Sequence, residues 1–136
     1  MSKIDCFEDI IAWQKARMND KKIFETISNS NAFLKDFALV DQIKRASGSI
    51  MDNIAEGFER GGNKEFVQFL YYAKGSSGEV RSQLYRALDR GYINQAIFET
   101  LYTQTKEISK LISGLIKYLQ DTEIKGERFK ENNFKL

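Results

Sequence analysis

The chain of 136 residues contains no proline. Proline disrupts helix interiors because it lacks the amide hydrogen and because its ring clashes with the preceding turn. The glycines fall mostly where apolar patterns with a spacing of three or four residues end, which is where glycine is favoured in helical proteins. The chain is therefore expected to form long helices joined by short turns.

Four amphipathic segments carry the helical spacing. They predict helices at about residues 9–28, 36–58, 63–90 and 94–119. Asn63 is expected to cap the third helix and Gly91 to end it. The stretch SNSNAFLKD predicts a turn between the first two helices. Four such helices with short connections predict an all-α, antiparallel up-down-up-down four-helix bundle.

The end of the chain has a different character. After Leu119 the residues are polar and evenly charged, without helical periodicity. We therefore expect a bundle domain over residues 1–120, followed by a frayed helix end and a mobile polar tail over residues 121–136.

Composition narrows the classes of function. No apolar run exceeds five residues, and the N-terminus MSKIDCFEDI lacks the apolar core of a signal peptide, so we expect a cytoplasmic protein with no membrane segment. The single cysteine, Cys6, excludes an intrachain disulfide and a cysteine-based metal cluster. Histidine is absent, which removes the usual general base and the commonest metal ligand. We therefore expect no metal, no cofactor and no enzymatic activity.

The first helix contains a carboxylate where its core side is expected. That side comprises Ile10, Trp13, Ala16, Ile23, Phe24 and Ile27. Asp20 lies seven residues from both Trp13 and Ile27, and an unpaired buried carboxylate is costly. Arg17, at the edge of this side, is the expected ion-pair partner. Catalysis by Asp20 is the weaker alternative, because no second acid or base accompanies it at helical spacing.

The second helix is apolar on two sides. Its core stripe consists of Leu39, Ile43, Ala46, Ile50, Ile54 and Gly57. A second apolar flank consists of Val40, Met51, Ala55 and Phe58. Because such helices are usually buried on both sides, we expect this flank to form an oligomer interface. Gly57 and the glycines of GSSG, residues 75–78, are expected to mark close approaches between helices.

A polar seam follows the other flank of the second helix. It consists of Gln42, Arg45, Ser49, Glu56 and Arg60. Glu56 and Arg60 have the spacing of an i,i+4 ion pair. We interpret this pair as a solvated or interfacial salt bridge.

The sequence resembles a known family in three stretches, which read AWQKA, QIKRASGSIMDNIAEGFERGGNKEFVQFLYYAKGSSGEVRSQL and RGYI. This family comprises four-helix-bundle proteins encoded in intervening sequences of bacterial 23S rRNA genes, and the resemblance covers about residues 7–119. It implies an antiparallel four-helix bundle that assembles as a homopentamer. The chain is also similar to the accessory variability determinant of diversity-generating retroelements, which implies binding of nucleic acid and of a reverse transcriptase.

The leading hypothesis is a nonenzymatic homo-oligomer that binds RNA or another nucleic acid. Antiparallel pairing of the second and third helices would gather a basic set along one half of that hairpin. This set consists of Lys44, Arg45, Arg81, Arg86 and Arg90. Cationic side chains there could neutralise phosphates. The structural alternative is an ordinary solvated face balanced by Asp41, Glu79 and Asp89, because the net charge is only +2.

The second hypothesis is a scaffold that holds a partner polypeptide, such as a reverse transcriptase, without nucleic acid. Phe58, Tyr71, Tyr72 and Tyr85 would supply its aromatic contacts. Aromatic residues at this spacing also occur in subunit interfaces and cores. An enzyme is the third and weakest hypothesis.

Overall fold

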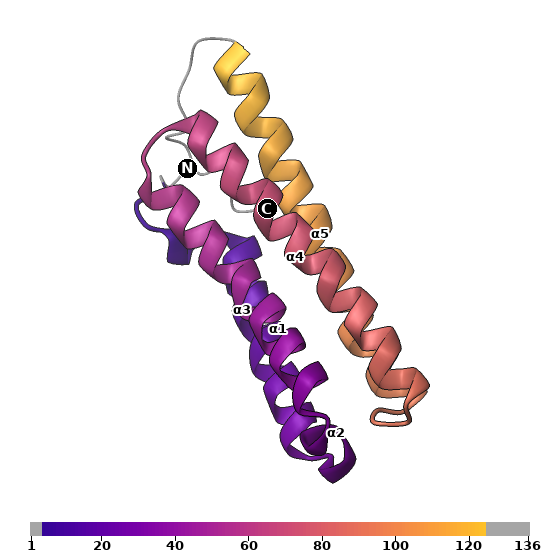
Figure 1. Ribbon diagram of the computed structural model, residues 1–136. Helices are drawn as coiled ribbons and strands as arrows, with labels where there is room; N and C mark the ends of the chain where they lie inside the picture. Colours follow the sequence, from indigo (N-terminus) through magenta and orange to yellow (C-terminus); the bar gives the residue numbers. More distant parts are fainter. Residues whose placement is uncertain (1–3, 125–136) are drawn as a thin grey trace.

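The computed structural model describes residues 4–124, which form four long helices and two short ones (Figure 1). In chain order they are η1 (Phe7–Asp9), α1 (Ile11–Ser28), α2 (Asn31–Lys35), α3 (Phe37–Glu59), α4 (Asn63–Asp89) and α5 (Gln95–Ile124). The four helices expected from the sequence are confirmed as α1, α3, α4 and α5.

The long helices pack as a bundle in which each one contacts two others. α3 packs against α1 and α4, and α5 packs against α4 and α1. Short connections reverse the chain after α1, α3 and α4 (Figure 1). No strand is present among residues 4–124. The predicted all-α four-helix bundle is confirmed, and its up-down-up-down order follows from these short connections.

The core contains an apolar stripe from each long helix. On α3 the stripe is the predicted one, and its residues are all buried: Leu39, Ile43, Ala46, Ile50, Ile54 and Gly57. α4 contributes Phe66, Leu70, Ala73, Val80 and Leu84, among others. Removal of these side chains from water is the main force that holds the helices together.

The buried face of α1 agrees with the prediction at Ile10, Ala16, Ile23 and Ile27 and differs from it at its edges. Its buried residues are Ala12, Ala16, Asn19, Ile23 and Ile27. Phe24, expected in the core, is 55% exposed. The buried face is therefore displaced by less than the rotation of about 100° that one residue makes, which is enough to bring Asn19 into the core and to leave Asp20 at its edge.

The expectation of a buried, paired Asp20 is therefore wrong. Asp20 is only partly buried and belongs to no ion pair among residues 4–124. Its expected partner, Arg17, lies instead over the ring of Trp13, with the guanidinium carbon 5.9 Å from the ring centroid. The buried polar residue of α1 is Asn19, whose side-chain amide donates a hydrogen bond of 2.9 Å to the hydroxyl of Thr105 on α5.

The connection between α1 and α3 contains a helix that the sequence analysis missed. Ser30 caps α2 by accepting a hydrogen bond from the amide of Phe33. Phe33 is 1% exposed and stacks on Tyr92, with ring centroids 5.2 Å apart. Small polar residues predicted only a turn here, but burial of this one aromatic side chain holds the segment as a helix.

The helix ends agree with the sequence at Gly91 and differ at Asn63. Gly91 follows the C-cap of α4 and has a φ of 75°, a conformation that glycine adopts without strain. The N-cap of α4 is Gly62, and Asn63 is the first helical residue. The expected capping role of Asn63 is therefore wrong.

Of the glycines expected at close helix contacts, Gly57 lies at such a contact, whereas those of the GSSG stretch do not. At Gly57 an added Cβ atom would lie 2.7 Å from Cβ of Phe69 and 3.0 Å from the ring of Phe66, so α3 and α4 approach closely there, as predicted. At Gly75 an added Cβ would meet nothing within 4 Å, and at Gly78 it would meet only the guanidinium of Arg81 at 3.7 Å, so the close approach predicted for these two glycines is wrong. In the GSSG stretch the buried residues are Ser76 and Ser77.

α5 extends beyond the predicted end of the bundle. The helix continues to Ile124, and Thr122 is buried. Of the frayed helix end and polar tail predicted over residues 121–136, residues 121–124 are helical, and residues 125–136 lie outside the described residues.

Candidate nucleic-acid interface

A polar cleft with a volume of about 520 Å³ lies between α3 and α4. It is lined by Gln42, Arg45, Ala46, Ser49, Ser76, Glu79, Ser82, Gln83 and Arg86. The residues from α3 include three of the polar seam expected from the sequence. Those from α4 recur at three, four or seven residues, so one flank of α4 faces this seam. We call this site the α3/α4 cleft.

A hydrogen bond between two serine side chains joins α3 and α4 at the α3/α4 cleft. The hydroxyl of Ser76 donates a bond of 3.0 Å to the hydroxyl of Ser49, and the amide of Asn53 also donates to that hydroxyl at 2.8 Å. The buried side-chain oxygen of Gln83 accepts no hydrogen bond within the described residues. The polar lining therefore links the two helices and retains one unused acceptor.

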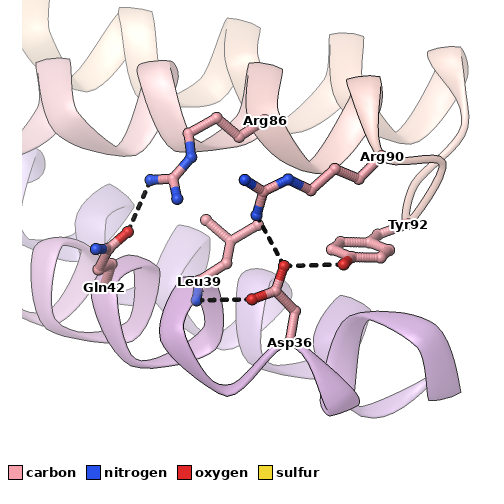
Figure 2. A network of polar contacts seen from close by, with 6 residues as sticks. All are labelled: Asp36, Leu39, Gln42, Arg86, Arg90 and Tyr92. Carbon is pink, nitrogen blue, oxygen red and sulfur yellow. Dashed lines mark hydrogen bonds and ion pairs between the residues drawn. The ribbon is translucent and has the colours of Figure 1, made fainter.

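Arg45 and Arg86 bring cationic groups to the cleft from different helices. The side chain of Arg45 is 79% exposed and pairs with Asp41 at 3.0 Å. The guanidinium of Arg86 donates a hydrogen bond of 2.7 Å to the side-chain oxygen of Gln42 (Figure 2). Only Arg45 of these two has a carboxylate partner.

Beyond Arg86 the polar contacts continue into a network around Asp36 (Figure 2). One carboxylate oxygen of Asp36 caps α3 by accepting a bond of 3.2 Å from the amide of Leu39. The other accepts bonds of 2.8 Å from Arg90 and from the hydroxyl of Tyr92. Asp36 therefore joins the start of α3 to the turn between α4 and α5.

These contacts shift the acid-base properties of the network. The hydrogen bond from Tyr92, together with those from Leu39 and Arg90, lowers the pKa of Asp36 against the opposing effect of desolvation. The same bond to Asp36 raises the pKa of the Tyr92 hydroxyl, because loss of its proton would place two negative groups together. The network is therefore stable with Asp36 ionised and Tyr92 protonated.

The five cationic residues proposed from the sequence do not lie on one face. Arg45 and Arg86 line the α3/α4 cleft, and Arg90 is nearby with Asp36 as its ion-pair partner. Lys44 lies in a different groove, between α1 and α3, with its ammonium 4.8 Å from the centroid of the Phe24 ring.

Arg81 lies on another side of α4. It is five residues from Arg86, which corresponds to about 140° around the helix. It precedes Tyr85 by one turn, and Tyr85 contacts the rings of Phe98 and Tyr102 on α5. Arg81 is therefore on the flank of α4 that faces α5, away from the α3/α4 cleft.

Comparison with known proteins identifies the family of the chain. The model of the family described as 23S rRNA-intervening sequence protein matches residues 8–114. The chain belongs to this family. No curated protein matches it in sequence.

One solved structure similar to this family member is that of a protein with unknown function from the S23 ribosomal protein family of Bacteroides thetaiotaomicron VPI-5482. The two structures superpose with a TM-score of 0.71 at 24% sequence identity, over 79% of this chain and 99% of that chain. At this identity the likeness shows a shared fold.

The proposed oligomer flank of this family member is partly covered by its own chain. Val40, Met51 and Phe58 pack against the core, and the Phe58 ring contacts Phe66 edge-on with centroids 6.0 Å apart. Ala55 is also partly buried. Other large apolar residues are more exposed, at 48–79%: Met18, Phe24, Phe37, Tyr71, Tyr72 and Tyr85.

Several residues of the site were not singled out from the sequence. The sequence analysis mentioned Tyr92 only as part of the RGYI stretch. Its hydrogen bond to Asp36, which is 56 residues away in the sequence, has no local sequence signal. Ser76 and Gln83 do have a local signal, because their separation of seven residues places them on one flank of α4. Choosing that flank requires knowledge of where α3 packs.

Two searches of the described residues were negative. Among residues 4–124, no group of three or more histidine, cysteine, aspartate or glutamate side chains could hold a metal ion. Within the same part of the chain, no helix combines the length and hydrophobicity needed to cross a bilayer.

Proposed function

We propose that this protein is a nonenzymatic oligomer that binds RNA or another nucleic acid through the α3/α4 cleft. The observation that supports this most directly is the pair Arg45 and Arg86, which come from two helices and line one cleft with hydroxyl and amide groups. Phosphate oxygens accept hydrogen bonds from all of these groups. Backbone contacts of this kind position a strand without reading its sequence.

The existing partners of these arginines do not prevent phosphate binding. The pair between Arg45 and Asp41 is exposed, and exposed ion pairs contribute only about 0–1 kcal/mol. Arg86 is held by a neutral amide, and no carboxylate within the described residues forms an ion pair with it. A phosphate can therefore compete for both guanidinium groups at low salt.

Assembly strengthens such weak contacts. We propose a homo-oligomer, with the pentamer that the family resemblance implies, and Val40, Met51, Ala55 and Phe58 as interface residues. Several clefts on one oligomer can engage one strand, which raises the effective concentration of each later contact. Light scattering that reports a monomer at micromolar concentration would remove this part of the proposal.

A protein-interaction scaffold is the second candidate. It is favoured by the exposed aromatic residues of α4, since Tyr71, Tyr72 and Tyr85 are each 48–49% exposed. Tyrosine is enriched among residues that dominate protein interfaces. Under this alternative a partner, such as a reverse transcriptase, would bind without nucleic acid.

Fluorescence anisotropy with labelled single-stranded RNA and DNA separates these two functions. The affinity should fall linearly with the logarithm of salt concentration, and each lost phosphate contact should reduce the slope by about 0.7–0.9. Arg45→Ala and Arg86→Ala should weaken binding to unrelated sequences by similar factors. Lys110→Ala and Lys117→Ala, which remove exposed cations of α5, are the matched controls. Absence of binding at tens of micromolar protein would leave the scaffold as the better hypothesis.

A further inference from the structure

A second depression lies on another flank of α3, where this helix meets α1. It has a volume of about 560 Å³ and is lined by Arg17, Asp20, Lys21, Ile23, Phe24, Lys44, Gly48 and Met51. Its volume is in the range of ligand pockets, about 300–1,000 Å³. We call it the α1/α3 groove.

The α1/α3 groove offers apolar surface to solvent. Ile23 lies in the core beneath it, Met51 is partly buried, and Phe24 is 55% exposed. Phe24 was expected in the core but lies outside the buried face of α1. An exposed aromatic ring beside further apolar side chains is typical of a surface that another molecule covers.

The charged residues of the α1/α3 groove have no ionic partners. Arg17, Asp20, Lys21 and Lys44 form no ion pair within residues 4–124. Lys44 lies over the ring of Phe24, and Arg17 lies over that of Trp13. Three cations therefore accompany a single carboxylate, so the local field is positive and attracts acidic groups.

Gly48 opens the groove from the side of α3. It lies within the helix, where glycine is less favourable than alanine, yet an added Cβ would meet nothing within 4 Å. Packing inside this chain therefore does not require a glycine at this position. Its absent side chain leaves room for a close approach from outside.

We propose that the α1/α3 groove binds one acidic amphipathic helix of a protein partner. Apolar side chains of that helix would cover Phe24, since Met51 is assigned above to the proposed oligomer interface, and its carboxylates would lie beside Arg17, Lys21 and Lys44. Helices that dock in grooves use apolar residues spaced by three or four positions, and charge complementarity then orients them. A nucleic-acid backbone matches the cations but leaves the apolar floor in water. This inference does not depend on nucleic-acid binding by the α3/α4 cleft.

The probe is a fluorescein-labelled peptide of two heptads with leucine at the a and d positions and glutamate elsewhere. Saturable micromolar binding to the full chain is expected, and a matched peptide with lysine in place of glutamate should not bind. Lys44→Glu should weaken binding at least tenfold. Lys110→Glu, on the exposed surface of α5, should leave it unchanged.

A pair of glycine variants tests the position of the peptide. Gly48→Ala and Gly75→Ala both replace helical glycines whose added Cβ meets nothing within 4 Å, so both should raise the melting temperature. Only Gly48→Ala should weaken peptide binding, by threefold or more. Because both variants fold, a change in binding reports on the groove.

Three results would overturn the proposal. The first is absence of saturable binding by the glutamate peptide, or equal binding of the lysine peptide. The second is complete displacement of the peptide by a single-stranded oligonucleotide that itself loses affinity in Gly48→Ala, which would assign the groove to nucleic acid. The third is a change of oligomeric state in Gly48→Ala, which would assign the groove to a second copy of this chain.

Discussion

The two flanks of α3 give their charged side chains different partners. Toward α4, Arg45 pairs with Asp41 and Arg86 bonds to Gln42. Toward α1, the cations of the α1/α3 groove have no carboxylate partner within residues 4–124. Both linings contain more cations than carboxylates, two to one in the α3/α4 cleft and three to one in the α1/α3 groove. Availability to a ligand therefore depends on the neighbours that each flank meets in the fold.

The packing of α3 differs along its length in the same way. Gly57 is enclosed by Phe66 and Phe69 of α4, whereas Gly48 is open on the side of α1. The first glycine is required by the structure of this chain, and the second is not. Gly57 is thus explained by packing between α3 and α4, whereas packing within this chain does not explain Gly48.

The largest expected effect breaks the close contact at Gly57. In Gly57→Ala the new methyl group would lie 2.7 Å from Cβ of Phe69, and such overpacking costs about 1–3 kcal/mol. Urea denaturation should show a lower midpoint. Gly48→Ala is the control and should gain up to about 1 kcal/mol, because alanine favours the helix. Equal midpoints for Gly57→Ala and the native protein would contradict the close contact.

The next largest effect is expected on nucleic-acid affinity, which should depend on the cations of the α3/α4 cleft more than on cations elsewhere. The double variant Arg45→Ala/Arg86→Ala should lower the affinity about tenfold at low salt. Because it loses two phosphate contacts, the slope of log affinity against log salt should decrease by about 0.7–0.9 for each of them. Lys44→Ala and Arg81→Ala should each have a smaller effect, since these residues lie outside the α3/α4 cleft. Similar losses from all four single variants in anisotropy would show that binding is spread over the surface.

The Asp36 network should make the stability of the fold depend on pH in the acid range. The pKa of Asp36 is lowered in the folded chain, so its ionised form stabilises the fold above the ordinary value of 3.8, and this contribution is lost as the pH falls through the lowered value. Asp36→Asn should therefore lower the melting temperature by a few degrees near neutral pH. The difference from the native protein should shrink below pH 3.8. A difference that stays constant with pH would contradict a role for the charge.

The smallest effect is expected at Asp20 in the α1/α3 groove. This carboxylate is only partly buried and has no ion-pair partner among residues 4–124. Asp20→Asn should change the free energy of unfolding by less than about 0.5 kcal/mol, as is usual for surface positions. Thermal melts at low and moderate salt should agree. A large loss of stability would show a contact that the groove geometry does not contain.

The sequence alone predicted the parts of the fold that depend on local spacing. The stripe from Leu39 to Gly57 on α3 is fully buried as expected, because apolar residues at three- and four-residue steps must face the core. The pair of Glu56 and Arg60 forms at 2.8 Å for the same local reason. The ending of α4 at Gly91 follows from the freedom of glycine to adopt positive φ.

Only the tertiary structure decided which flanks meet and which remain open. The buried face of α1 is displaced from the predicted one by less than one residue, which is enough to bury Asn19 and expose Phe24. The five proposed cations separate onto different faces because each residue turns the helix by about 100°. Helical spacing places side chains around one axis, but their neighbours come from helices distant in sequence. The bundle was therefore determined by the local pattern, and its candidate sites by packing.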